Sequence, residues 1–358
     1  MIVAGWSFTN ICNLKCKHCY NASGRLRENE LNIVEAIEVA DKLKNSGVVA
    51  VNFGGGECAL HPDFIPLCKY LNNLGIKISY TTNGTTYDKI KDNLSLFHDI
   101  GVSLDFPDRE RHDYQRGIPG TFDKAVSTIE NLVKNSVDTE IVTCLTALNC
   151  SNKDLQKFYD LSKELGVNYW RLNRFRANGR GKDNKNSFAL SHEQLKNAYT
   201  FLKRYIPDEL SVPEPIFRAA FGGSYYVSGD PSGFTSFRIQ ANGEVSPSVF
   251  LSSSGGNVKT KSIEEIMNSE IFQLIRNRVP NSKCANCPAY EHCKGGDTAA
   301  SFLENGHFNG PDPMCWINPN DKGEISTNVT KASGGNWNVH ELYLCTLYIP
   351  IKKQGEIS

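Results

Sequence analysis

The sequence predicts an α/β fold in which a partial (β/α)6 TIM-like barrel is followed by a small, cysteine-rich C-terminal domain. Two observations carry this prediction. From residue 1 to about residue 205, short apolar runs alternate with amphipathic stretches of helical period, which is the pattern of βα units on a parallel sheet. After that point the chain becomes rich in Pro, Gly and Ser. We therefore predict a domain boundary within residues 205–215.

The predicted strands are six segments rich in β-branched and apolar residues, at 2–8, 48–53, 77–82, 101–105, 140–145 and 169–173. Amphipathic stretches predict helices between them, at 33–45, 64–74, 122–134, 155–165 and 193–205. Six strands do not close a barrel of this type, so we expect a partial one. In such barrels the active site lies at the carboxyl ends of the strands, so we expect functional residues in the loops that follow the strands.

We expect the chain to have three parts. Residues 1–210 form the barrel, residues 211–315 form the C-terminal domain, and residues 316–358 form a tail. Within the second part, FRIQANGEV predicts a β-hairpin because Asn242 and Gly243 suit a tight turn. Within the tail, the partly alternating run ELYLCTLYIPIKK predicts a strand or a docking segment.

The composition limits the functional classes. With 358 residues, of which 40% are hydrophobic, the chain is typical of a soluble globular enzyme. Its 39 basic and 39 acidic residues give a formal net charge of +0, so no overall field attracts nucleic acid or anionic lipid. The first residues, MIVAGWSFTN, do not form a signal peptide, and no stretch reaches the roughly 18 apolar residues of a membrane span. We expect a cytoplasmic protein.

Seven of the twelve cysteines lie in two tight groups at opposite ends of the chain, which favours metal binding in a reducing compartment over disulfides. The first group is in NICNLKCKHCYN, after the first predicted strand. There Cys16 follows Cys12 by four residues and Cys19 follows Cys16 by three. A 4Fe-4S cluster normally takes four thiolates, so a loop that supplies three leaves one iron open to a ligand. The alternative is a zinc site completed by His18 or by a distant residue.

This CxxxCxxC loop, placed after the first strand of a βα array, resembles that of the radical S-adenosylmethionine (radical SAM) superfamily. The resemblance implies a 4Fe-4S cluster whose open iron chelates the amino and carboxylate groups of S-adenosylmethionine. It also implies that one electron cleaves the sulfonium to give a 5'-deoxyadenosyl radical.

The segment after the second strand, FGGGECALHPDF, resembles the GGEP element of that family, with Cys58 in place of Pro. Glycines at Gly55 and Gly56 allow a backbone to approach a ligand closely. By resemblance, the Glu57 carboxylate accepts hydrogen bonds from the methionine ammonium. The alternative is a plain turn between a strand and a helix.

The third and fourth strands end in YTTNGT and GVSLDFPDRERHDYQRG. The second of these resembles the SLDGP and HDxxRG stretch of the family, with Phe106 in place of Gly. The resemblance implies that four residues surround the ribose and the methionine carboxylate, namely Asn83, Ser103, Asp105 and Arg116. The alternative for Asp105 and Arg116 is a surface salt bridge, which contributes little stability.

The sixth strand runs into YWRLNRFRANGRG, which offers four arginines to a carboxylate of the cofactor or the substrate, namely Arg171, Arg174, Arg176 and Arg180. The alternative is that these side chains are solvated. The GRG element is similar to one in peptide-modifying relatives, and we therefore give Arg174 a role in the site.

The second group of cysteines lies in CANCPAYEHCKGGD and PDPMCW and consists of Cys284, Cys287, Cys293 and Cys315. Four thiolates close a metal site, and a zinc ribbon is an equal alternative on spacing alone. The segment resembles the SPASM-type extension of radical SAM enzymes. This resemblance implies that the four cysteines hold an auxiliary 4Fe-4S cluster, which transfers electrons or stabilises the fold.

In the SPASM pattern a neighbouring auxiliary cluster takes further cysteines. Here Asp297 stands at the fourth position of the run, and Ser248 stands at the position expected in the hairpin. Both replacements imply that this chain keeps one auxiliary cluster and lacks the other. The alternative is that Asp297 is an unusual ligand.

The remaining cysteines are Cys58, Cys68, Cys144, Cys150 and Cys345. Isolated cysteines are usually small buried hydrophobic residues. Cys58, beside the cofactor loop, and Cys345, in the tail, are our two candidates for donating a hydrogen atom to a substrate radical.

We therefore predict a radical SAM enzyme that abstracts hydrogen from a residue of a ribosomally made peptide, with a cross-link, an epimerisation or a decarboxylation as the outcome. The expected partners are the peptide and an electron donor such as flavodoxin or ferredoxin. The segment before Cys12 is too short for a leader-binding domain, so the peptide binds the barrel mouth directly or through a separate leader-binding protein. The alternatives are a radical enzyme for a small molecule, such as a tetrapyrrole or a sugar, and a non-catalytic iron-sulfur electron carrier.

Overall fold

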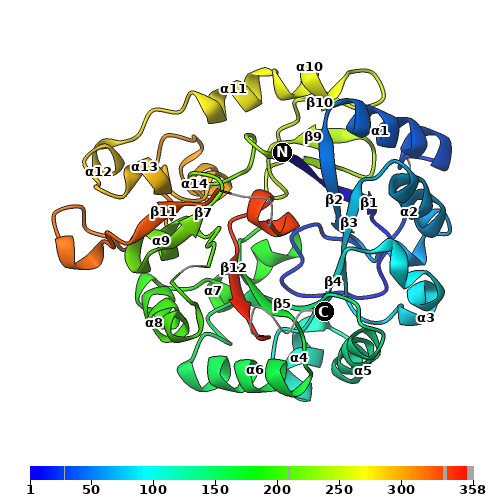
Figure 1. The fold of residues 1–358 in the computed structure, drawn as a ribbon, viewed down its shortest axis with the longest axis horizontal. Coiled ribbons are helices and arrows are strands. Elements are labelled where there is room, and N and C mark those ends of the chain that lie inside the picture. The colour runs from blue at the N-terminus through cyan, green and yellow to red at the C-terminus, as the bar shows by residue number, and fades with distance from the viewer. Residues whose placement is uncertain (28, 209, 334–336, 353–358) are drawn as a thin grey trace.

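A computed structural model describes residues 1–27, 29–208, 210–333 and 337–352. Six parallel strands follow one another in order across a curved sheet, and helices alternate with them along the chain (Figure 1). The strands are β1 (Ile2–Thr9), β2 (Val48–Gly55), β3 (Lys77–Thr82), β4 (Asp99–Ser103), β5 (Thr139–Leu145) and β6 (Tyr169–Arg174). The predicted partial barrel is confirmed.

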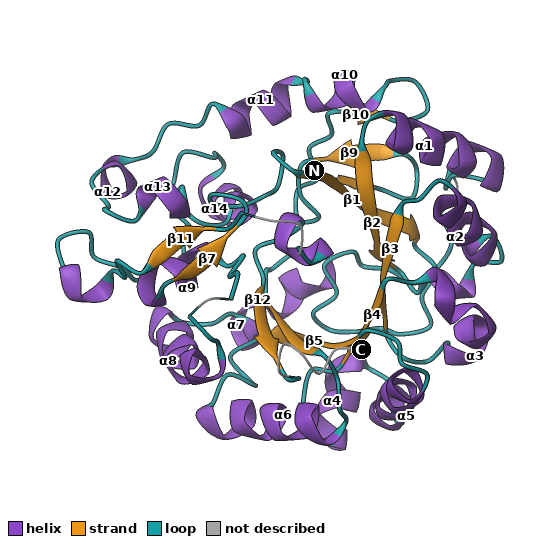
Figure 2. Cartoon of the chain, in the orientation of Figure 1, coloured by secondary structure: helices purple, strands orange, loops and turns teal. Residues whose placement is uncertain are grey.

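Helices form an outer ring around this sheet (Figure 2). Those between the six strands are α1 (Ile33–Asn45), α2 (Phe64–Asn73), α3 (Tyr87–Ile90), α4 (Arg109–Arg116), α5 (Thr121–Lys134) and α6 (Asn152–Glu164). Their limits follow from local sequence. At the start of α1, for example, the Asn32 side chain accepts the Glu35 amide hydrogen while the Glu35 carboxylate accepts that of Asn32.

The sheet extends beyond the six strands at both edges. On one side β8 (Ser236–Ile239) pairs parallel with β1 and is followed by β9 (Glu244–Ser246) and β10 (Gly256–Asn257). On the other side β12 (Leu347–Pro350) pairs antiparallel with β6. The hairpin predicted from FRIQANGEV is therefore β8 and β9, with Gly243 at φ +87° in the turn, and it belongs to the barrel sheet.

Alternate residues of the inner strands face opposite sides of the sheet. In β1, Trp6 and Phe8 face the helices, and the Trp6 ring stacks on that of Phe53 with 5.7 Å between centroids. Gly5 faces the barrel interior, where a Cβ atom would overlap the hydroxyl of Tyr343. The strand therefore needs glycine at this position because the C-terminal part of the chain packs directly on its backbone.

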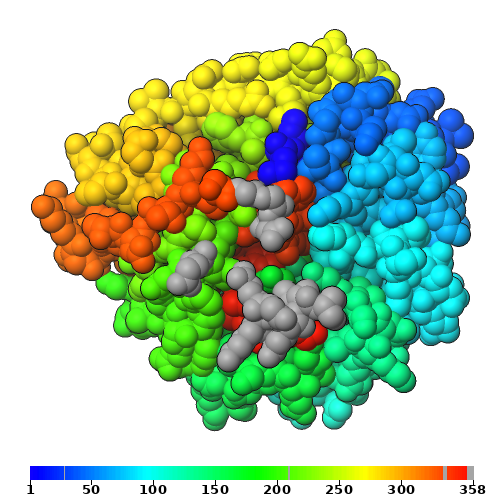
Figure 3. Space-filling model, viewed as in Figure 1, coloured from blue at the N-terminus to red at the C-terminus, as the bar shows by residue number. Residues whose placement is uncertain are grey.

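The C-terminal segment, residues 337–352, fills the interior of the barrel. Its short turn Val339–Leu342 leads to Tyr343, whose carbonyl accepts a hydrogen bond from Ser236 Oγ of β8 at 2.9 Å, and then to β12 beside β6. The segment thus spans the gap between the two edges of the sheet. Its red ribbon lies inside the ring in Figure 1, and its red atoms show in the hollow at the centre of Figure 3. Residues 334–336 and 353–358 of the predicted tail lie outside the described residues.

His340 anchors this segment through a buried hydrogen-bond network. Its Nδ1 lies 3.1 Å from Asn52 Nδ2 and 2.6 Å from Arg171 Nη1, and both of these groups donate, so Nδ1 is unprotonated. The other ring nitrogen, Nε2, then carries the proton and lies 3.0 Å from Ser79 Oγ, which donates in turn to Asp99 at 2.6 Å. Burial, followed by the charge of Arg171, lowers the pKa of His340 to about 3. The ring is therefore neutral.

Glu140 completes the network at the barrel interior. Its Oε2 lies 3.1 Å from Arg171 Nε, and its Oε1 accepts a hydrogen bond from the Tyr348 hydroxyl of β12. Ligand-type atoms of Asp99, Glu140 and His340 all lie within 4.8 Å of one another. Arg171 contacts both Glu140 and His340, so the guanidinium of the protein itself supplies the positive charge of this cluster.

The chain outside the barrel strands is made of short elements. The helices are α7 (Lys185–Phe188), α8 (His192–Leu202), α9 (Pro215–Phe221), α10 (Ile263–Met267), α11 (Glu270–Arg276), α12 (Ser282–Ala285), α13 (Tyr290–Cys293) and α14 (Thr298–Asn305). A separate two-stranded parallel sheet joins β7 (Gly223–Tyr225) to β11 (Val329–Lys331). Within the described residues, no helix has both the length and the apolar composition needed to cross a membrane.

Candidate active site

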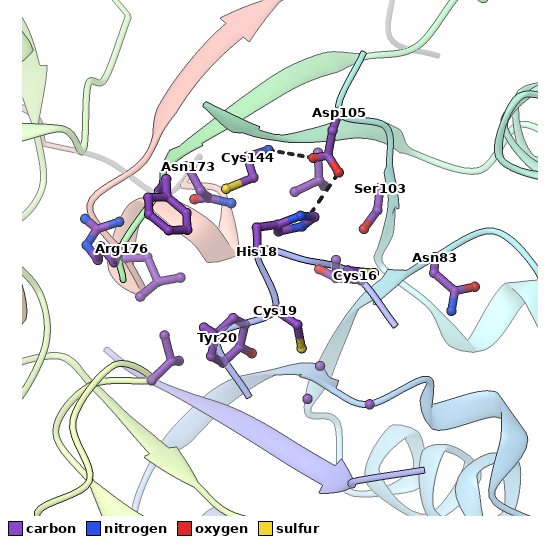
Figure 4. Close-up of a pocket in the computed structure, with 18 of the residues that line it drawn as sticks. Cys16, His18, Cys19, Tyr20, Asn83, Ser103, Asp105, Cys144, Asn173 and Arg176 are labelled. Atoms are coloured by element: carbon purple, nitrogen blue, oxygen red, sulfur yellow. Dashed lines mark hydrogen bonds and ion pairs between the residues drawn. The ribbon is translucent and has the colours of Figure 1, made fainter. Parts of the chain in front are cut away.

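A cavity of about 220 Å³ lies at the carboxyl ends of the strands, where a barrel of this kind places its chemistry (Figure 4). Its wall combines parts of the chain that are far apart in sequence. The cysteine loop after β1 and the ends of β2 to β6 supply most of it, while β8, the loop after β9 and the C-terminal segment supply Arg238, Val249, Phe250, Tyr343 and Leu344.

The three cysteines of the first group all line this cavity, as the sequence predicts. Hydrogen bonds tie both ends of their loop together, because Cys12 N donates to the Gly24 carbonyl at 2.9 Å and Gly24 N donates to Asn10 at 2.8 Å. All twelve cysteines are described and free, so none of these thiols is committed to a disulfide. Burial raises the pKa of Cys12 to about 11, and a bound metal cluster would stabilise the thiolate. Three thiols from one loop on one cavity fit a 4Fe-4S cluster with an open iron.

The glycines after β2 are explained by contact with the cysteine loop. A Cβ atom at Gly56 would overlap the Ile11 carbonyl, and one at Gly55, which has φ +98°, would lie 2.8 Å from Ser7 Cβ. The backbone nitrogens of Gly56 and Glu57 donate to the carbonyls of Thr9 and Ile11 at 2.9 and 2.8 Å. Both glycines line the cavity, and they also let β2 support the cysteine loop closely.

Glu57 lies in the cavity wall, but its carboxylate is largely occupied by the third strand and the loop after it. Oε1 accepts hydrogen bonds from Tyr80, from Thr82 at 2.7 Å and from Thr86 at 2.5 Å. From the residues that the structure describes, Oε2 accepts only the Asn83 amide hydrogen, at 2.8 Å. One lone pair of Oε2 is therefore left for a ligand.

Asn83 and Ser103 also line the cavity, from the ends of β3 and β4. Asn83 Nδ2 lies 3.0 Å from Asn13 Oδ1 and 3.9 Å from Cys12 Sγ, so this side chain supports the cysteine loop. Among the described residues, the Ser103 hydroxyl has no hydrogen-bond partner, which leaves it open to a ligand.

Asp105 and Arg116 form a buried ion pair, not a surface salt bridge. Arg116 Nε lies 2.7 Å from Asp105 Oδ2, and Arg116 Nη1 lies 3.8 Å from Cys16 Sγ. Asp105 also accepts the Cys144 amide hydrogen at 3.0 Å and faces His18 at 3.6 Å (Figure 4). Burial would raise the pKa of Asp105, but the charges of Arg116, His18 and His112 and the hydrogen bond from the Cys144 amide together outweigh it, and the pKa falls to about 2. The pair braces the back of the cysteine loop, and both Asp105 oxygens are already engaged.

Three of the arginines in β6 and the loop after it are neutralised by carboxylates. Arg174 forms a two-pronged ion pair with Asp312, at 3.2 and 2.6 Å, and lies 3.1 Å from Glu214. The other two pairs are Arg171 with Glu140 and Arg176 with Asp297. Arg174 lines the cavity, but its guanidinium already joins β6 to Glu214 and to the loop before Cys315, and its role as a binding group for a cofactor carboxylate stays a prediction.

The cavity wall also corrects the choice of hydrogen-donor cysteines. Cys58 is fully buried and its Sγ donates to the Gly54 carbonyl at 3.4 Å, and Cys345 is 4% exposed; neither side chain lines the cavity. Cys144, at the end of β5, does line it and is drawn in Figure 4 beside His18 and Asn173. No local pattern predicts this, because an isolated cysteine on a strand is usually a buried core residue.

Sequence reasoning also missed Arg238 and the pair Tyr343 and Leu344, which line the cavity. They come from strand β8 and the C-terminal segment, whose pairing with β1 and β6 joins residues more than 170 positions apart. No local motif marks them.

The four cysteines of the second group line one small, nearly apolar cavity, together with Gly295 and Ile317. The residues come from α12, α13 and the loop after α14. Burial raises the pKa of Cys284 to about 11, so this site too suits a metal cluster that stabilises thiolates. Four sulfurs around a small, nearly apolar cavity fit an iron-sulfur cluster in which every iron has a cysteine ligand.

Asp297 and Ser248 do not belong to this second cavity. Asp297 caps α14 by accepting the Ala300 amide hydrogen at 2.8 Å, and its other oxygen pairs with Arg176. The Ser248 hydroxyl accepts the Phe250 amide hydrogen at 3.4 Å. The geometry therefore gives no support to Asp297 as a cluster ligand.

Comparison with known proteins agrees with this geometry. Residues 6–161 match the radical SAM superfamily, and residues 231–288 match the iron-sulfur cluster-binding domain called SPASM. The chain is 29% identical over 322 residues to the mycofactocin maturase MftC of Mycolicibacterium smegmatis, covering 87% of this chain and 81% of the relative. It is 25% identical over 340 residues to the AdoMet-dependent heme synthase of Methanosarcina barkeri, covering 88% of this chain and 97% of the relative.

Two solved structures share the fold. Streptococcus suis SuiB bound to its precursor peptide SuiA has a TM-score of 0.68 at 17% identity, covering 88% of this chain and 76% of that one. The enzyme anSMEcpe with bound AdoMet and the Cp18Cys peptide has a TM-score of 0.70 at 19% identity, covering 88% and 94%. At these identities the likeness establishes the fold alone.

Proposed function

The chain belongs to the radical SAM superfamily and carries a SPASM-type iron-sulfur domain, and on this premise we propose that it abstracts a hydrogen atom from a residue of a ribosomally made peptide. When bound, the cluster and S-adenosylmethionine supply the one-electron cleavage that makes hydrogen abstraction feasible. The barrel contributes the thiols of Cys12, Cys16 and Cys19 and a cavity that shields the reaction from water.

The cofactor contacts that we propose follow from which cavity groups are free. Ser103 has an unengaged hydroxyl, and Glu57 Oε2 keeps a lone pair for an ammonium group. Asn83, Gly55 and Gly56 line the same wall and hold the cysteine loop against it. Asp105 and Arg116 act through that loop, because their charges already satisfy each other beside Cys16.

The size and lining of the cavity support a peptide substrate. Pockets that enclose a drug-sized molecule measure about 300–1,000 Å³. This cavity of about 220 Å³ lies below that range and also has to accept S-adenosylmethionine, so it does not enclose a second whole molecule beside the cofactor. Apolar groups of Val142, Phe175, Val249, Phe250 and Leu344 face it. A peptide that inserts one residue and keeps the rest outside suits this shape, and the relative MftC is named a mycofactocin maturase.

A small-molecule substrate is the second candidate, and the likeness to heme synthases favours it. A tetrapyrrole needs a wider cavity and cationic groups for its carboxylates. Four of the six arginines that line the cavity are already neutralised by carboxylates of the protein, and the other two, Arg180 and Arg238, donate hydrogen bonds to the cysteine loop. The cavity therefore favours the peptide.

We propose three further features of the reaction. An electron donor of the flavodoxin or ferredoxin type reduces the barrel cluster. A separate protein presents the leader of the peptide if the barrel mouth does not bind it. If the product is an epimer, Cys144 donates the returning hydrogen atom, because it is the isolated cysteine that faces the cavity. Cysteine groups that suit metal clusters also support a location in the reducing cytoplasm.

The test has two stages. The reduced, cluster-loaded protein is mixed with S-adenosylmethionine, and 5'-deoxyadenosine is measured; the Cys16→Ala variant is the control. The enzyme is then co-expressed with short neighbouring open reading frames, and peptides are compared by mass spectrometry with those from Cys16→Ala cells. We expect a mass change in one peptide. Turnover of a small carboxylic acid with no change in any peptide would refute the proposal.

A further inference from the structure

Six arginines line the main cavity, and four of them are neutralised by buried carboxylates, in the pairs Arg116 with Asp105, Arg171 with Glu140, Arg174 with Asp312 and Arg176 with Asp297. In the part of the chain that the structure describes, the other two, Arg180 and Arg238, have no carboxylate within ion-pair distance. Arg238 is buried, and Arg180 is half-buried with its Nη2 atom out of contact with solvent. An unpaired charge removed from water is unfavourable, so both side chains call for an anionic partner.

Arg238 reaches the cavity from β8 and is only 2% exposed. Its Nη1 donates to Tyr343 Oη at 3.0 Å, and its Nη2 donates to Tyr20 Oη at 3.2 Å and to the Ser7 hydroxyl. All three acceptors are hydroxyl groups, which carry no formal charge. Arg238 therefore keeps its full positive charge beside the residue that follows Cys19, and its Nε has no hydrogen-bond partner among the described residues.

Arg180 binds the cysteine loop from the other side of the sheet, in the segment that follows β6. Its Nε donates to the Cys16 carbonyl at 3.0 Å, its Nη1 donates to the Ser23 carbonyl at 2.6 Å, and its backbone nitrogen donates to the Cys19 carbonyl at 2.9 Å. Gly179, at φ +53°, packs so closely on the Cys19 and Tyr20 carbonyls that a side chain does not fit. The acceptors are again uncharged, and within the described part of the chain Arg180 Nη2 has no hydrogen-bond partner.

Both unpaired guanidinium groups thus contact the one loop that carries the three cluster thiols. We propose that Arg180 and Arg238 are the counter-charges of the barrel cluster and that they raise its reduction potential. Three thiolates make the cluster anionic, and the single electron taken from an external reductant adds a further negative charge. In a buried site of low dielectric, a fixed positive charge nearby stabilises the more negative, reduced form. Arg180 is in addition a positioning residue, because it holds the carbonyls on either side of the loop.

The test is a reductive titration of the cluster-loaded protein with dithionite, followed by electron paramagnetic resonance, without substrate. The variants are Arg238→Gln, Arg238→Lys, Arg180→Gln and Arg180→Lys. Arg109→Gln is the control, since Arg109 pairs with Asp123 on the surface. We expect both glutamine variants to move the midpoint of the barrel cluster to more negative potential, while Arg238→Lys and the control keep the wild-type value. Iron content confirms loading of each variant.

Two outcomes would overturn the proposal. The first is an unchanged midpoint in Arg238→Gln, which would mean that its charge does not reach the cluster. The second is an equal shift in the lysine and glutamine variants at position 238, which would make packing the cause. If Arg180→Gln fails to hold iron because its hydrogen bonds to the loop are lost, Arg238→Gln and the similarly long Arg238→Met still decide the question. The titration contains no peptide, so its result is independent of the substrate proposal.

Discussion

The Arg174 guanidinium lies 3.2 and 2.6 Å from the two carboxylate oxygens of Asp312, a residue 138 positions later in the chain. Arg174 ends the last parallel strand of the barrel, and Asp312 lies three residues before Cys315, the distal cysteine of the second group. A buried, two-pronged ion pair thus links the strand at the main cavity to the loop that completes the second cysteine site.

The first prediction concerns this link. In Arg174→Met, the carboxylates of Asp312 and Glu214 stay buried without their cation, and we expect a loss of about 3–5 kcal/mol in the free energy of unfolding. Urea unfolding followed by circular dichroism measures it. Arg109→Met, which removes an exposed ion pair with Asp123, is the matched control and should change stability little. Equal stability of the two variants would show that the pair does not hold the domains together.

Arg174 also shows where sequence reasoning stops. The segment that forms the sixth strand and the loop after it was predicted to supply arginines to the site. All four of them line the cavity, namely Arg171, Arg174, Arg176 and Arg180. Their roles depend on Glu140, Asp297 and Asp312, which no pattern in the sequence pairs with them. The sequence alone does not distinguish an arginine whose charge is free from one that a distant carboxylate neutralises.

The elements that were predicted well are those whose signals are local. Helix α1 and strand β3 have the predicted bounds because capping and apolar periodicity act over a few residues. The two cysteine groups were also predicted from local signals, because the members of each group lie close together in the sequence and line one cavity. The pairing of β8 with β1 and the insertion of residues 337–352 into the barrel depend on contacts across most of the chain. These contacts put Arg238 and Tyr343 in the cavity.

The second prediction concerns acid stability. The pKa of His340 is about 3 in the folded chain and 6.5 without its surroundings, so as the pH falls the unfolded chain takes up the proton first. The stability that the neutral ring provides is therefore complete above pH 6.5 and declines toward pH 3, by about 1.4 kcal/mol per pH unit.

His340→Asn isolates this effect, because an amide can accept from Arg171 without titrating in this range. We expect the variant to be less stable at pH 7 and to show a flatter dependence of unfolding free energy on pH between 6.5 and 4. Other groups that titrate there, such as His112, are common to both proteins and cancel in the difference. Parallel curves would contradict a neutral, buried His340.

The third prediction tests the packing of the C-terminal segment on β1. Gly5→Ala places a methyl group where the Tyr343 ring lies, and the overpacking should cost about 1–3 kcal/mol of stability. Tyr343→Leu removes the overlapping atoms. In the double variant, Gly5→Ala should therefore cost much less than it does alone, and the two changes should be strongly non-additive. Chemical denaturation of the four proteins measures this, and simple additivity would mean that Tyr343 does not lie over Gly5.

The fourth prediction concerns the ligands of the auxiliary cluster. Two 4Fe-4S clusters give about eight irons per chain, and Cys315→Ala should leave about four because three thiolates no longer close the second site. Asp297→Asn should keep all of them, since this side chain caps α14 and pairs with Arg176 outside the second cavity. Cys150→Ser, a change in a thiol that lines neither cavity, controls for general loss of iron during purification. Iron loss in Asp297→Asn comparable to that in Cys315→Ala would restore Asp297 as a ligand.

The same Cys315→Ala variant tests the role of the auxiliary cluster. If it still forms 5'-deoxyadenosine but no longer modifies its substrate, the auxiliary cluster serves electron transfer after hydrogen abstraction. If it unfolds at lower urea and otherwise turns over normally, the cluster stabilises the fold.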